Sequence, residues 1–372
     1  MKVGILTFHR ANNYGAVLQA YALQQHLLSQ DIDCDIIDYR SSAMEEQYRV
    51  KSLFERRGFK DIIRWALNSS SEKRIVAVFE KFRKTHLVVS TKKYESSKDL
   101  KEGERFYDRI ICGSDQVWSY KALGFDKNYL LDFTDDRSKK YSYAASFGVE
   151  SIPLEFIPEY KRCLSGFSSL SVREARGVDL VKEITGFDAE LHLDPVFLLG
   201  REDWVNQMKC KRLKKKYIFV YAFELTASMK LFIERLTVRT SCDVLVLTRT
   251  YRKILNVPYS CVSGLTPPEF VETINNAEYV VTNSFHGTAF SILLNKLFFT
   301  EMLFESSHVN SRLTNILDLF SLTERKIGTV EISKMLDDGI DWNFVNSIIF
   351  TQREKSGSYL RRITQPRSEG SI

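Results

Sequence analysis

The sequence predicts an α/β protein in which parallel sheets and helices alternate in two halves of the chain. Short apolar runs that end in small or charged residues alternate with stretches of helical periodicity. A lysine-rich stretch at residues 208–217 interrupts this alternation, which then begins again. The length of 372 residues, with 44% hydrophobic residues, suits about two domains. We therefore expect two Rossmann-like domains.

The N-terminal half begins with a strand–helix–strand unit. An apolar run at 2–8 is followed by a polar loop, by a helical pattern after Gly15 and by a second strand at 34–39. Residues 51–92 have a helical pattern without a clear strand. Further strands that end in small or charged residues are predicted at 107–115, 141–148 and 169–174. We expect an N-terminal domain over residues 1–210.

The second half repeats the alternation. A helix is predicted from Pro267, with Thr266 as its N-cap. Strands are predicted at 217–224, 243–248, 278–284 and 297–302. We expect a C-terminal domain over residues 211–340 and a helical tail over residues 341–372 that packs back on the first domain.

Composition excludes several classes of protein. Lys and Arg number 53 against 47 Asp and Glu, and this net charge of +6 is too small for a nucleic-acid-binding composition. The six cysteines are scattered and predict reduced core thiols. The six histidines lack metal-site spacing, so no metal is expected. The sequence has neither a signal-peptide pattern nor about 18 consecutive apolar residues, and we expect a cytoplasmic protein.

The stretch TNSFHG, residues 282–287, interrupts an apolar strand before an apolar helix. The strand is expected to end near Ser284 and the helix to begin near Gly287. The amides of the first helical turn would then face the strand end, where an anion binds. His286 would supply a charge-assisted hydrogen bond or a proton. A capped turn with a satisfied histidine explains the pattern equally well.

Two other strand ends carry candidate ligand-binding groups. Arg173 follows the strand at 169–172 and is suited to hold a phosphate or carboxylate; the alternative is an exposed arginine paired with Glu174 or Glu155. Ser114 and Asp115 follow the strand before them, and Asp115 is either a base for a sugar hydroxyl or a helix cap.

The first loop offers polar groups for a sugar, or forms a plain polar turn. It contains Asn12, Asn13 and Tyr14 and lacks the G-x-G-x-x-G dinucleotide pattern. Two other segments suggest contact with a membrane surface. They are the basic run at 209–216 and the amphipathic segment at 52–68, and the alternatives are a solvated linker and an ordinary packed helix.

Taken in order along the chain, these motifs resemble the polysaccharide pyruvyl transferase family over nearly the whole sequence. The resemblance rests on FHRANNYGAVLQAYAL, ICGSDQVW, YAASFG, SVRE, LDPVFLL and, most specifically, TNSFHGTAFSILLNKLF. It implies a GT-B-like architecture of two Rossmann-like domains, with the acceptor side in residues 1–210 and the donor side in residues 211–340. It also implies transfer of the enolpyruvyl group of phosphoenolpyruvate onto a sugar diol, which gives a cyclic pyruvate ketal and free phosphate.

The resemblance implies a role for each candidate group. Phosphoenolpyruvate, the co-substrate, would be bound by Arg173 and by Ser284, Phe285, His286 and Gly287. His286 would act as the acid or assist the leaving phosphate, and Asp115 would contact the acceptor or act as base.

The resemblance also implies an acceptor and a place in the cell. The acceptor is expected to be a lipid-linked oligosaccharide at the inner membrane face, used in surface or capsular polysaccharide synthesis. Its sugar is expected to be bound by Asn12, Asn13, Tyr14 and Ser114. No resident cofactor is expected.

One departure from the family pattern concerns the donor site. Some relatives have an arginine two residues before the histidine, where this sequence has Ser284. Arg249, Arg252 and Arg312 are the alternatives for the missing cation. The rival functions are a nucleotide-sugar glycosyltransferase of the same architecture and a non-catalytic sugar-binding or membrane scaffold.

Overall fold

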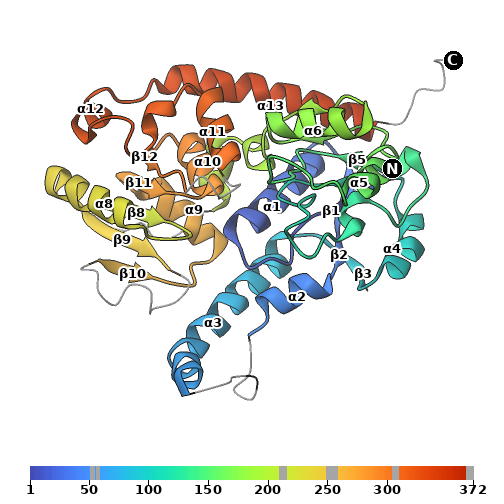
Figure 1. Cartoon of the computed structure of the whole chain (residues 1–372), viewed down its shortest axis with the longest axis horizontal. Helices are drawn as coiled ribbons and strands as arrows, with labels where there is room; N and C mark the ends of the chain where they lie inside the picture. The colour runs from blue at the N-terminus through green and yellow to red at the C-terminus, as the bar shows by residue number, and fades with distance from the viewer. Residues whose placement is uncertain (51–54, 56–58, 209–215, 249–258, 304–309, 366–372) are drawn as a thin grey trace. The chain divides into compact units, whose positions relative to one another are not determined.

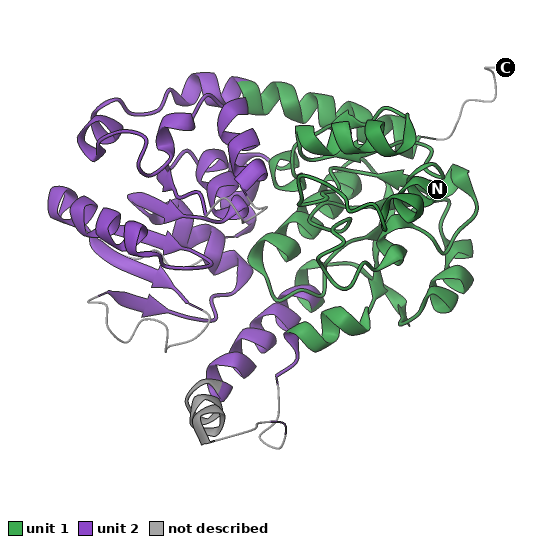
Figure 2. Ribbon diagram, in the orientation of Figure 1, with its two compact units in different colours: residues 1–47, 84–199, 348–372 green, residues 48–83, 200–347 purple. Residues whose placement is uncertain are grey.

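A computed structural model describes residues 1–50, 55, 59–208, 216–248, 259–303 and 310–365. For residues 59–68 only the backbone is described. The chain divides into two compact units, coloured separately in Figure 2. Unit 1 contains residues 1–47, 84–199 and 348–372, and unit 2 contains residues 48–83 and 200–347. The second unit therefore resumes at Gly200, and residues 48–83 belong with it.

Unit 1 is built on a parallel five-stranded sheet of order β3-β2-β1-β4-β5 (Figure 1). Its strands are β1 (Lys2–Leu6), β2 (Asp33–Tyr39), β3 (Val89–Tyr94), β4 (Arg109–Cys112) and β5 (Lys140–Ser142). The short strands β6 (Ser171–Val172) and β7 (Glu190–Leu191) pair with each other, and bridges such as Ala145–Val172 join β6 to the β5 side. The prediction of no strand up to residue 92 was wrong, because β3 begins at Val89 and pairs with β2.

Helices connect these strands and cover the sheet. They are α1 (Tyr14–Leu28), α2 (Ser42–Tyr48), α4 (Ser97–Gly103), α5 (Ile157–Leu164) and α6 (Ala175–Thr185), whereas α3 (Phe59–His86) links β2 to β3 in sequence but lies mostly in unit 2. Helix α1 is buried along most of its length because its apolar residues extend around much of the helix. Strand residues such as Val3, Ile5 and Ile110 are fully buried, as is typical of a parallel sheet covered on both faces.

The C-terminal helix α13 (Trp342–Thr364) contributes its second half to unit 1. The Tyr359 hydroxyl donates a hydrogen bond to the Ser142 carbonyl over 2.8 Å, and the Arg353 guanidinium donates to the carbonyls of Phe197 and Leu199. Tyr359 is buried. The end of the chain is therefore part of the packing of unit 1.

Unit 2 repeats the arrangement with a parallel sheet of order β10-β9-β8-β11-β12. Its strands are β8 (Tyr217–Tyr221), β9 (Asp243–Leu247), β10 (Ser260–Val262), β11 (Tyr279–Thr282) and β12 (Leu297–Thr300). Its helices are α7 (Arg201–Gln207), α8 (Ala227–Thr240), α9 (Pro267–Asn276), α10 (Phe285–Leu293), α11 (Asn310–Leu319) and α12 (Ile332–Asp337). Thr266 caps α9 in a capping box with Glu269, as the sequence predicted.

The core of unit 2 lies on both faces of its sheet. Helix α8 packs Phe232 and Ile233 against strand residues such as Val281 and Phe299. Phe290 of α10 contacts other aromatic rings, with its centroid 5.1 Å from that of Trp204. Both faces of the sheet are covered, so the exposed place for ligand chemistry is the edge formed by the carboxyl ends of the strands.

Candidate functional site

The first group of predicted site residues lies where the strand order of unit 1 reverses. From β1 the chain proceeds outward to β2 and β3, whereas β4 and β5 lie on the other side of β1. In open α/β sheets, ligands bind at such a reversal, outside the carboxyl ends of the two strands. The Thr7 hydroxyl, after β1, donates to the Ser114 carbonyl, after β4, over 2.9 Å. The structure therefore holds together the two loops that carry the predicted acceptor residues.

In the first loop, local structure accounts for part of the polar pattern. Asn13 is the N-cap of α1, and its side chain accepts a hydrogen bond from the Ala16 amide over 3.2 Å. Asn12 and Tyr14 are buried. The helix therefore begins at the carboxyl end of β1 with its first amides directed to the sheet edge.

Asp115 has a backbone conformation that residues other than glycine rarely adopt. Its φ is +79°, and its Oδ1 accepts the Gln116 amide over 2.9 Å. No α-helix begins there, which removes the helix-cap alternative. The side chain keeps 16% exposure. A strained residue of this kind costs roughly 1–3 kcal/mol, a cost typical of functional positions.

Arg173 is buried rather than exposed, so the alternative of a surface arginine was wrong. Its Nη1 lies 2.5 Å from Asp194 Oδ2, and its Nη2 lies 3.9 Å from Asp115 Oδ1. A third carboxylate oxygen, Oε2 of Glu174, lies 4.0 Å from the guanidinium Nε. The side chain of Arg173 is 2% exposed. One buried cation thus faces three carboxylates, of which Asp115 is the most accessible.

This cluster forms because its members follow adjacent strands. Asp115 follows β4, Arg173 follows β6 and Asp194 comes three residues after β7. Parallel strands bring their carboxyl ends to one edge, so residues far apart in sequence meet there. Asp194 and Glu174 were missed as site residues, because β7 is only two residues long and was not predicted. The LDPVFLL motif, which contains Asp194, was the available signal.

Glu174 holds the loop that follows β5. Its Oε1 accepts hydrogen bonds from the Ser146 hydroxyl over 2.9 Å and from the Phe147 amide over 3.0 Å. The Ser146 amide in turn donates to the Asp115 carbonyl over 3.0 Å. Glu174 therefore fixes the backbone beside Asp115 and, with Arg173, supports the position of that carboxylate.

A second polar pair lies at the same edge. The His9 ring contacts Asp38, which lies in β2, with Nε2 3.2 Å from Oδ1. Burial raises the pKa of the Asp38 carboxyl, but hydrogen bonds from His9 and Arg40 outweigh it and hold the pKa below its ordinary value. The prediction did not include this pair, because His9 and Asp38 are 29 residues apart in sequence.

The second group of predicted site residues lies at the corresponding reversal in unit 2, between β8 and β11. Strand β11 ends at Thr282 and α10 begins at Phe285, two residues earlier than expected in each case. Ser284 is the N-cap, and its hydroxyl accepts the Gly287 amide over 3.4 Å. The capped turn predicted for this stretch is therefore present, and the anion site stays a prediction.

Asn283 ties this turn to the loop after β8. Its Oδ1 accepts the Phe223 amide over 2.8 Å, and its Nδ2 donates to the Glu224 carbonyl over 2.9 Å. The Thr282 hydroxyl donates to the Tyr221 carbonyl over 2.5 Å and accepts the Ser284 amide over 3.0 Å. The start of α10 is therefore rigidly positioned, as a preorganised anion site requires.

His286 and the candidate cations have distinct positions. His286 is the second residue of α10 and is buried, with its ring 5.1 Å from that of Phe285. Arg312 is a buried residue of α11, a helix that contacts α10. Arg249 and Arg252 lie outside the described residues. Arg173 lies in unit 1, whereas the turn 284–287 lies in unit 2.

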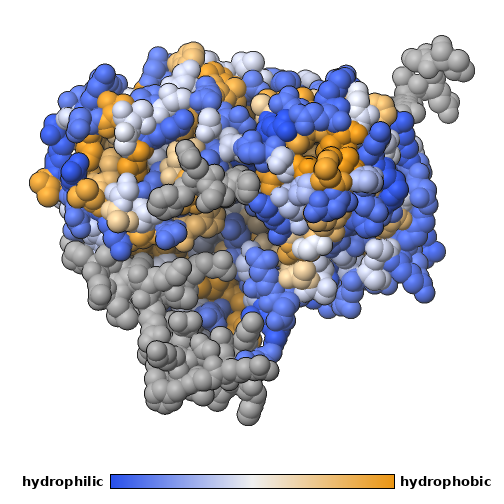
Figure 3. Space-filling view, in the orientation of Figure 1, coloured by the Kyte–Doolittle hydropathy of each residue, from blue (hydrophilic) through white to orange (hydrophobic). Residues whose placement is uncertain are grey.

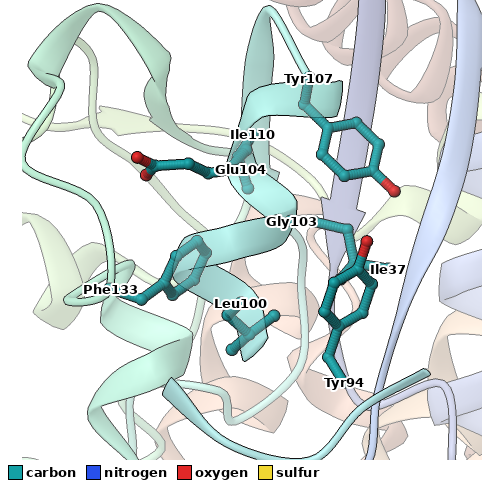
Figure 4. A pocket seen from close by; sticks show the side chains of 8 residues that line it. All are labelled: Ile37, Tyr94, Leu100, Gly103, Glu104, Tyr107, Ile110 and Phe133. Carbon is teal, nitrogen blue, oxygen red and sulfur yellow. The ribbon is translucent and has the colours of Figure 1, made fainter. Parts of the chain in front are cut away.

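A small pocket in unit 1 contains none of the predicted site residues (Figure 4). Its empty volume is about 150 Å³, and it is lined by Ile37, Tyr94, Leu100, Gly103, Glu104, Tyr107, Ile110 and Phe133. These residues are mainly apolar and lie around β2, β3 and α4. We interpret the pocket as incomplete packing rather than as a ligand site.

Other predictions concern metals, thiols and membranes. The residues placed in the structure include no group of three His, Cys, Asp or Glu that suits a metal ion. The five cysteines that are described are free thiols, four of them buried, and Cys210 lies outside the described residues. Within the described part of the chain, no helix has the length and apolar composition needed to cross a bilayer.

The segments predicted to contact a membrane are largely beyond the description. The side chains of residues 56–68 and the run 209–215 are not described. On the face shown in Figure 3 the surface is mainly hydrophilic, with separate apolar patches. Exposed apolar side chains such as Leu154 and Val238, 82% and 85% exposed, lie in different units. Membrane contact therefore stays a prediction.

Comparisons with known proteins identify the fold and the family pattern. A family model described as polysaccharide pyruvyl transferase matches residues 13–300, more than half of the chain. A comparison with curated proteins gives no match. The structure is similar to that of a UDP-N-acetylglucosamine 2-epimerase from Listeria monocytogenes described as putative, with a TM-score of 0.53, 10% identity and coverage of 100% of this chain and 99% of the other.

The structure is also similar to that of the UDP-GlcNAc 2-epimerase of Neisseria meningitidis bound to UDP-GlcNAc. The TM-score is 0.51 at 10% identity, and the match covers 98% of this chain and 94% of the other. At this identity the likeness concerns the fold alone. Both neighbours have GT-B-type folds, which confirms the predicted fold class of two Rossmann-like sheets.

Proposed function

The chain belongs to the polysaccharide pyruvyl transferase family, and on that premise we propose that it transfers the enolpyruvyl group of phosphoenolpyruvate onto a sugar diol, forming a cyclic pyruvate ketal and releasing phosphate. The observation that supports this most is the position of the predicted residues. Apart from Arg173, which follows β6, they lie at the two strand-order reversals, between β1 and β4 and between β8 and β11, where open α/β sheets bind ligands.

On the donor side, the capped start of α10 is suited to the anionic groups of phosphoenolpyruvate. Ser284 and Gly287 order the turn, and His286 lies in its first helical turn. A helix N-terminus contributes only about 0.3–1 kcal/mol to anion binding, so a cation is needed as well. Arg312 is our candidate for this cation, because it lies within the described residues and its helix α11 contacts α10. We assign His286 to the donor phosphate or to proton transfer.

On the acceptor side, Asp115 is our candidate for the base that takes the proton of a sugar hydroxyl. It is the most exposed carboxylate of its cluster, and Arg173, Glu174 and Asp194 hold its surroundings. Because carboxylates surround the Arg173 guanidinium, we now assign Arg173 to positioning Asp115 rather than to binding phosphate. Asn12, Asn13, Tyr14 and Ser114 line the same edge and are proposed to contact the sugar.

The acceptor is proposed to be a polyprenyl-diphosphate-linked oligosaccharide in surface or capsular polysaccharide synthesis, reached at the inner face of the cytoplasmic membrane. The basic run at 209–216 and the segment at 52–68 support this part of the proposal. Sedimentation with liposomes that contain anionic lipid, compared with neutral liposomes, tests it. Equal sedimentation with both would contradict membrane binding.

The central test measures phosphate released from phosphoenolpyruvate in the presence of lipid-linked acceptors, with mass spectrometry of the product. Asp115→Asn and His286→Ala are each expected to lower turnover by about 10²–10⁴-fold. Asp135→Asn is the matched control, because Asp135 is fully exposed and pairs only at the surface with Lys101. Wild-type activity in both site variants would contradict the assignments.

The nucleotide-sugar alternative makes a different prediction. If the protein were a glycosyltransferase of the same fold, uridine or guanosine diphosphate would raise its melting temperature. We expect phosphoenolpyruvate to raise it and the nucleotides to leave it unchanged. A non-catalytic scaffold would release no phosphate with any acceptor.

A further inference from the structure

A glutamate that the sequence analysis did not select lies at the proposed donor site. Glu301 directly follows β12, which pairs with β11, and its amide donates to the Thr282 carbonyl over 2.9 Å. The residue is only 7% exposed. A buried carboxyl group at the carboxyl edge of a parallel sheet is unusual, because burying it is unfavourable unless it is partnered or used.

The side chain of Glu301 reaches across the end of β11. Its Oε1 accepts a hydrogen bond from the Thr226 hydroxyl over 2.7 Å, and Thr226 belongs to the loop after β8. Strand β11 lies between β8 and β12, as Figure 1 shows. The hydrogen bond from Thr226 to Glu301 therefore connects the segments after β8 and β12, past the carboxyl end of β11. The Thr282–Ser284 turn that leads into α10 lies at that end.

One carboxyl oxygen of Glu301 is held and the other is not. The Thr226 hydroxyl donates its proton to Glu301 and also accepts a hydrogen bond from the Met229 amide, as the N-cap of α8. It therefore fixes the orientation of Glu301 through Oε1. Oε2 is buried, and among the described residues it has no hydrogen-bond partner. A catalytic role is one of the established reasons for a buried polar atom to have no partner.

We propose that Glu301 is the general acid that protonates carbon three of phosphoenolpyruvate. The inference rests on the proposed function. In the proposed step, a proton on Oε2 passes to the CH₂ carbon while a sugar hydroxyl oxygen bonds to carbon two, and the proton of that hydroxyl is taken by the acceptor-side base. A second hydroxyl then displaces phosphate from carbon two, and its proton leaves with the phosphate group.

The contacts of Glu301 decide which of its oxygens faces a ligand. Among the described residues, its carboxyl group has one hydrogen bond, from Thr226 to Oε1. Thr226 donates to Oε1, so the proton is placed on Oε2, the atom without a partner. The Glu301 base left after transfer would be reprotonated before the next turnover.

The test uses the full chain and compares Glu301→Gln with Glu278→Gln. Glu278 precedes β11 at the opposite end of the same strand and is 42% exposed, so it serves as the matched control. Glu301→Gln is expected to lower kcat by about 10²–10⁴-fold. It should leave the KM for phosphoenolpyruvate, and the melting-temperature shift caused by phosphoenolpyruvate alone, close to those of the wild type.

Chemical rescue separates catalysis from a structural role. In Glu301→Ala, formate or acetate is expected to restore turnover by at least about tenfold in proportion to the concentration of the neutral acid. Glu301→Asp is the second variant, for the case in which Glu301→Ala fails to fold. Because it keeps a carboxyl group, Glu301→Asp should retain part of the activity. A wild-type kcat in Glu301→Gln overturns the inference, as does loss of phosphoenolpyruvate binding together with kcat. If the wild type itself releases no phosphate, the proposed function fails instead.

Discussion

Replacement of Gly287 by alanine is expected to destabilise the protein, mainly because of the Thr282 hydroxyl group. An added Cβ at this position would lie 2.3 Å from Thr282 Oγ1 and 3.1 Å from Tyr221 Cδ1. The Thr282 hydroxyl does not move aside easily, since it donates to the Tyr221 carbonyl and accepts the Ser284 amide. Gly287→Ala must therefore break these two hydrogen bonds or displace the start of α10.

The magnitude follows from two opposing terms. Overpacking costs typically about 1–3 kcal/mol, and a contact this short belongs at the upper end of that range. Alanine is favoured over glycine within a helix by about 1 kcal/mol. We expect Gly287→Ala to lower the free energy of unfolding by about 2 kcal/mol. Gly357→Ala is the matched control: Gly357 also lies within a helix, but its nearest neighbour atom would be 3.5 Å away, so a gain of about 0.5–1 kcal/mol is expected.

The assay is a double-mutant cycle by chemical denaturation, followed by tryptophan fluorescence, to which buried Trp204, in contact with Phe290 of α10, contributes. In a Thr282→Ala background the 2.3 Å contact is absent and the contacts of 3.1 Å with the Cβ of residue 282 and with Tyr221 Cδ1 remain, so Gly287→Ala should cost clearly less than in the wild type. Turnover should also fall in the single variant, since a displacement of about 1 Å at a site lowers rates by about 10²-fold. Equal destabilisation in both backgrounds would refute the reasoning.

Three further predictions follow from buried groups. Burial, with the nearby charges of Lys355 and Arg362, lowers the pKa of His192 to about 3, whereas the unfolded chain has a histidine pKa of about 6.5; the unfolded state therefore takes up the proton first, and stability should fall by about 1.4 kcal/mol per pH unit below pH 6.5. His192→Gln should reduce the slope by this amount in denaturation curves, while Ser171→Ala, which removes the hydrogen bonds with Nδ1 and with the Ala144 amide but keeps the imidazole, should leave the slope as it is. Arg173→Met leaves three carboxylates without their cation and should cost about 3–5 kcal/mol at pH 7 by denaturation; an unchanged free energy of unfolding would contradict the charge argument. Burial raises the pKa of the Cys34 thiol to about 12, so in native protein with Cys210→Ser a thiol reagent followed by mass spectrometry should modify partly exposed Cys261 first, and early labelling of Cys34 would contradict its burial.

The sequence predicted the sheets better than the details of the site. Long apolar runs such as 2–8 and 217–224 identified β1 and β8, because buried parallel strands are continuously apolar. Strand β3 was missed because only Tyr94 among its residues is buried, and its pattern Val-Ser-Thr-Lys-Lys-Tyr is that of a polar edge. Edge strands carry little of the apolar signal on which such predictions depend.

The site residues divide in the same way. Asp115 and Ser284 were identified because each directly follows an apolar strand. Asp194 and Glu301 were not, because their partners are Arg173, 21 residues away, and Thr226, 75 residues away. Contacts of this kind depend on strand order, which one sequence does not specify.

The packing of α13 has a consequence for the order in which the protein folds as it is synthesised. Every residue of unit 2 precedes residue 348, whereas unit 1 includes residues 348–372, with the buried Tyr359 bonded to Ser142. Domains fold as units once their residues have left the ribosome. Unit 2, although it starts later in the chain, can therefore finish first. The strands of unit 1 must wait for the last segment to emerge, so their apolar surface is the one that a chaperone would need to shield.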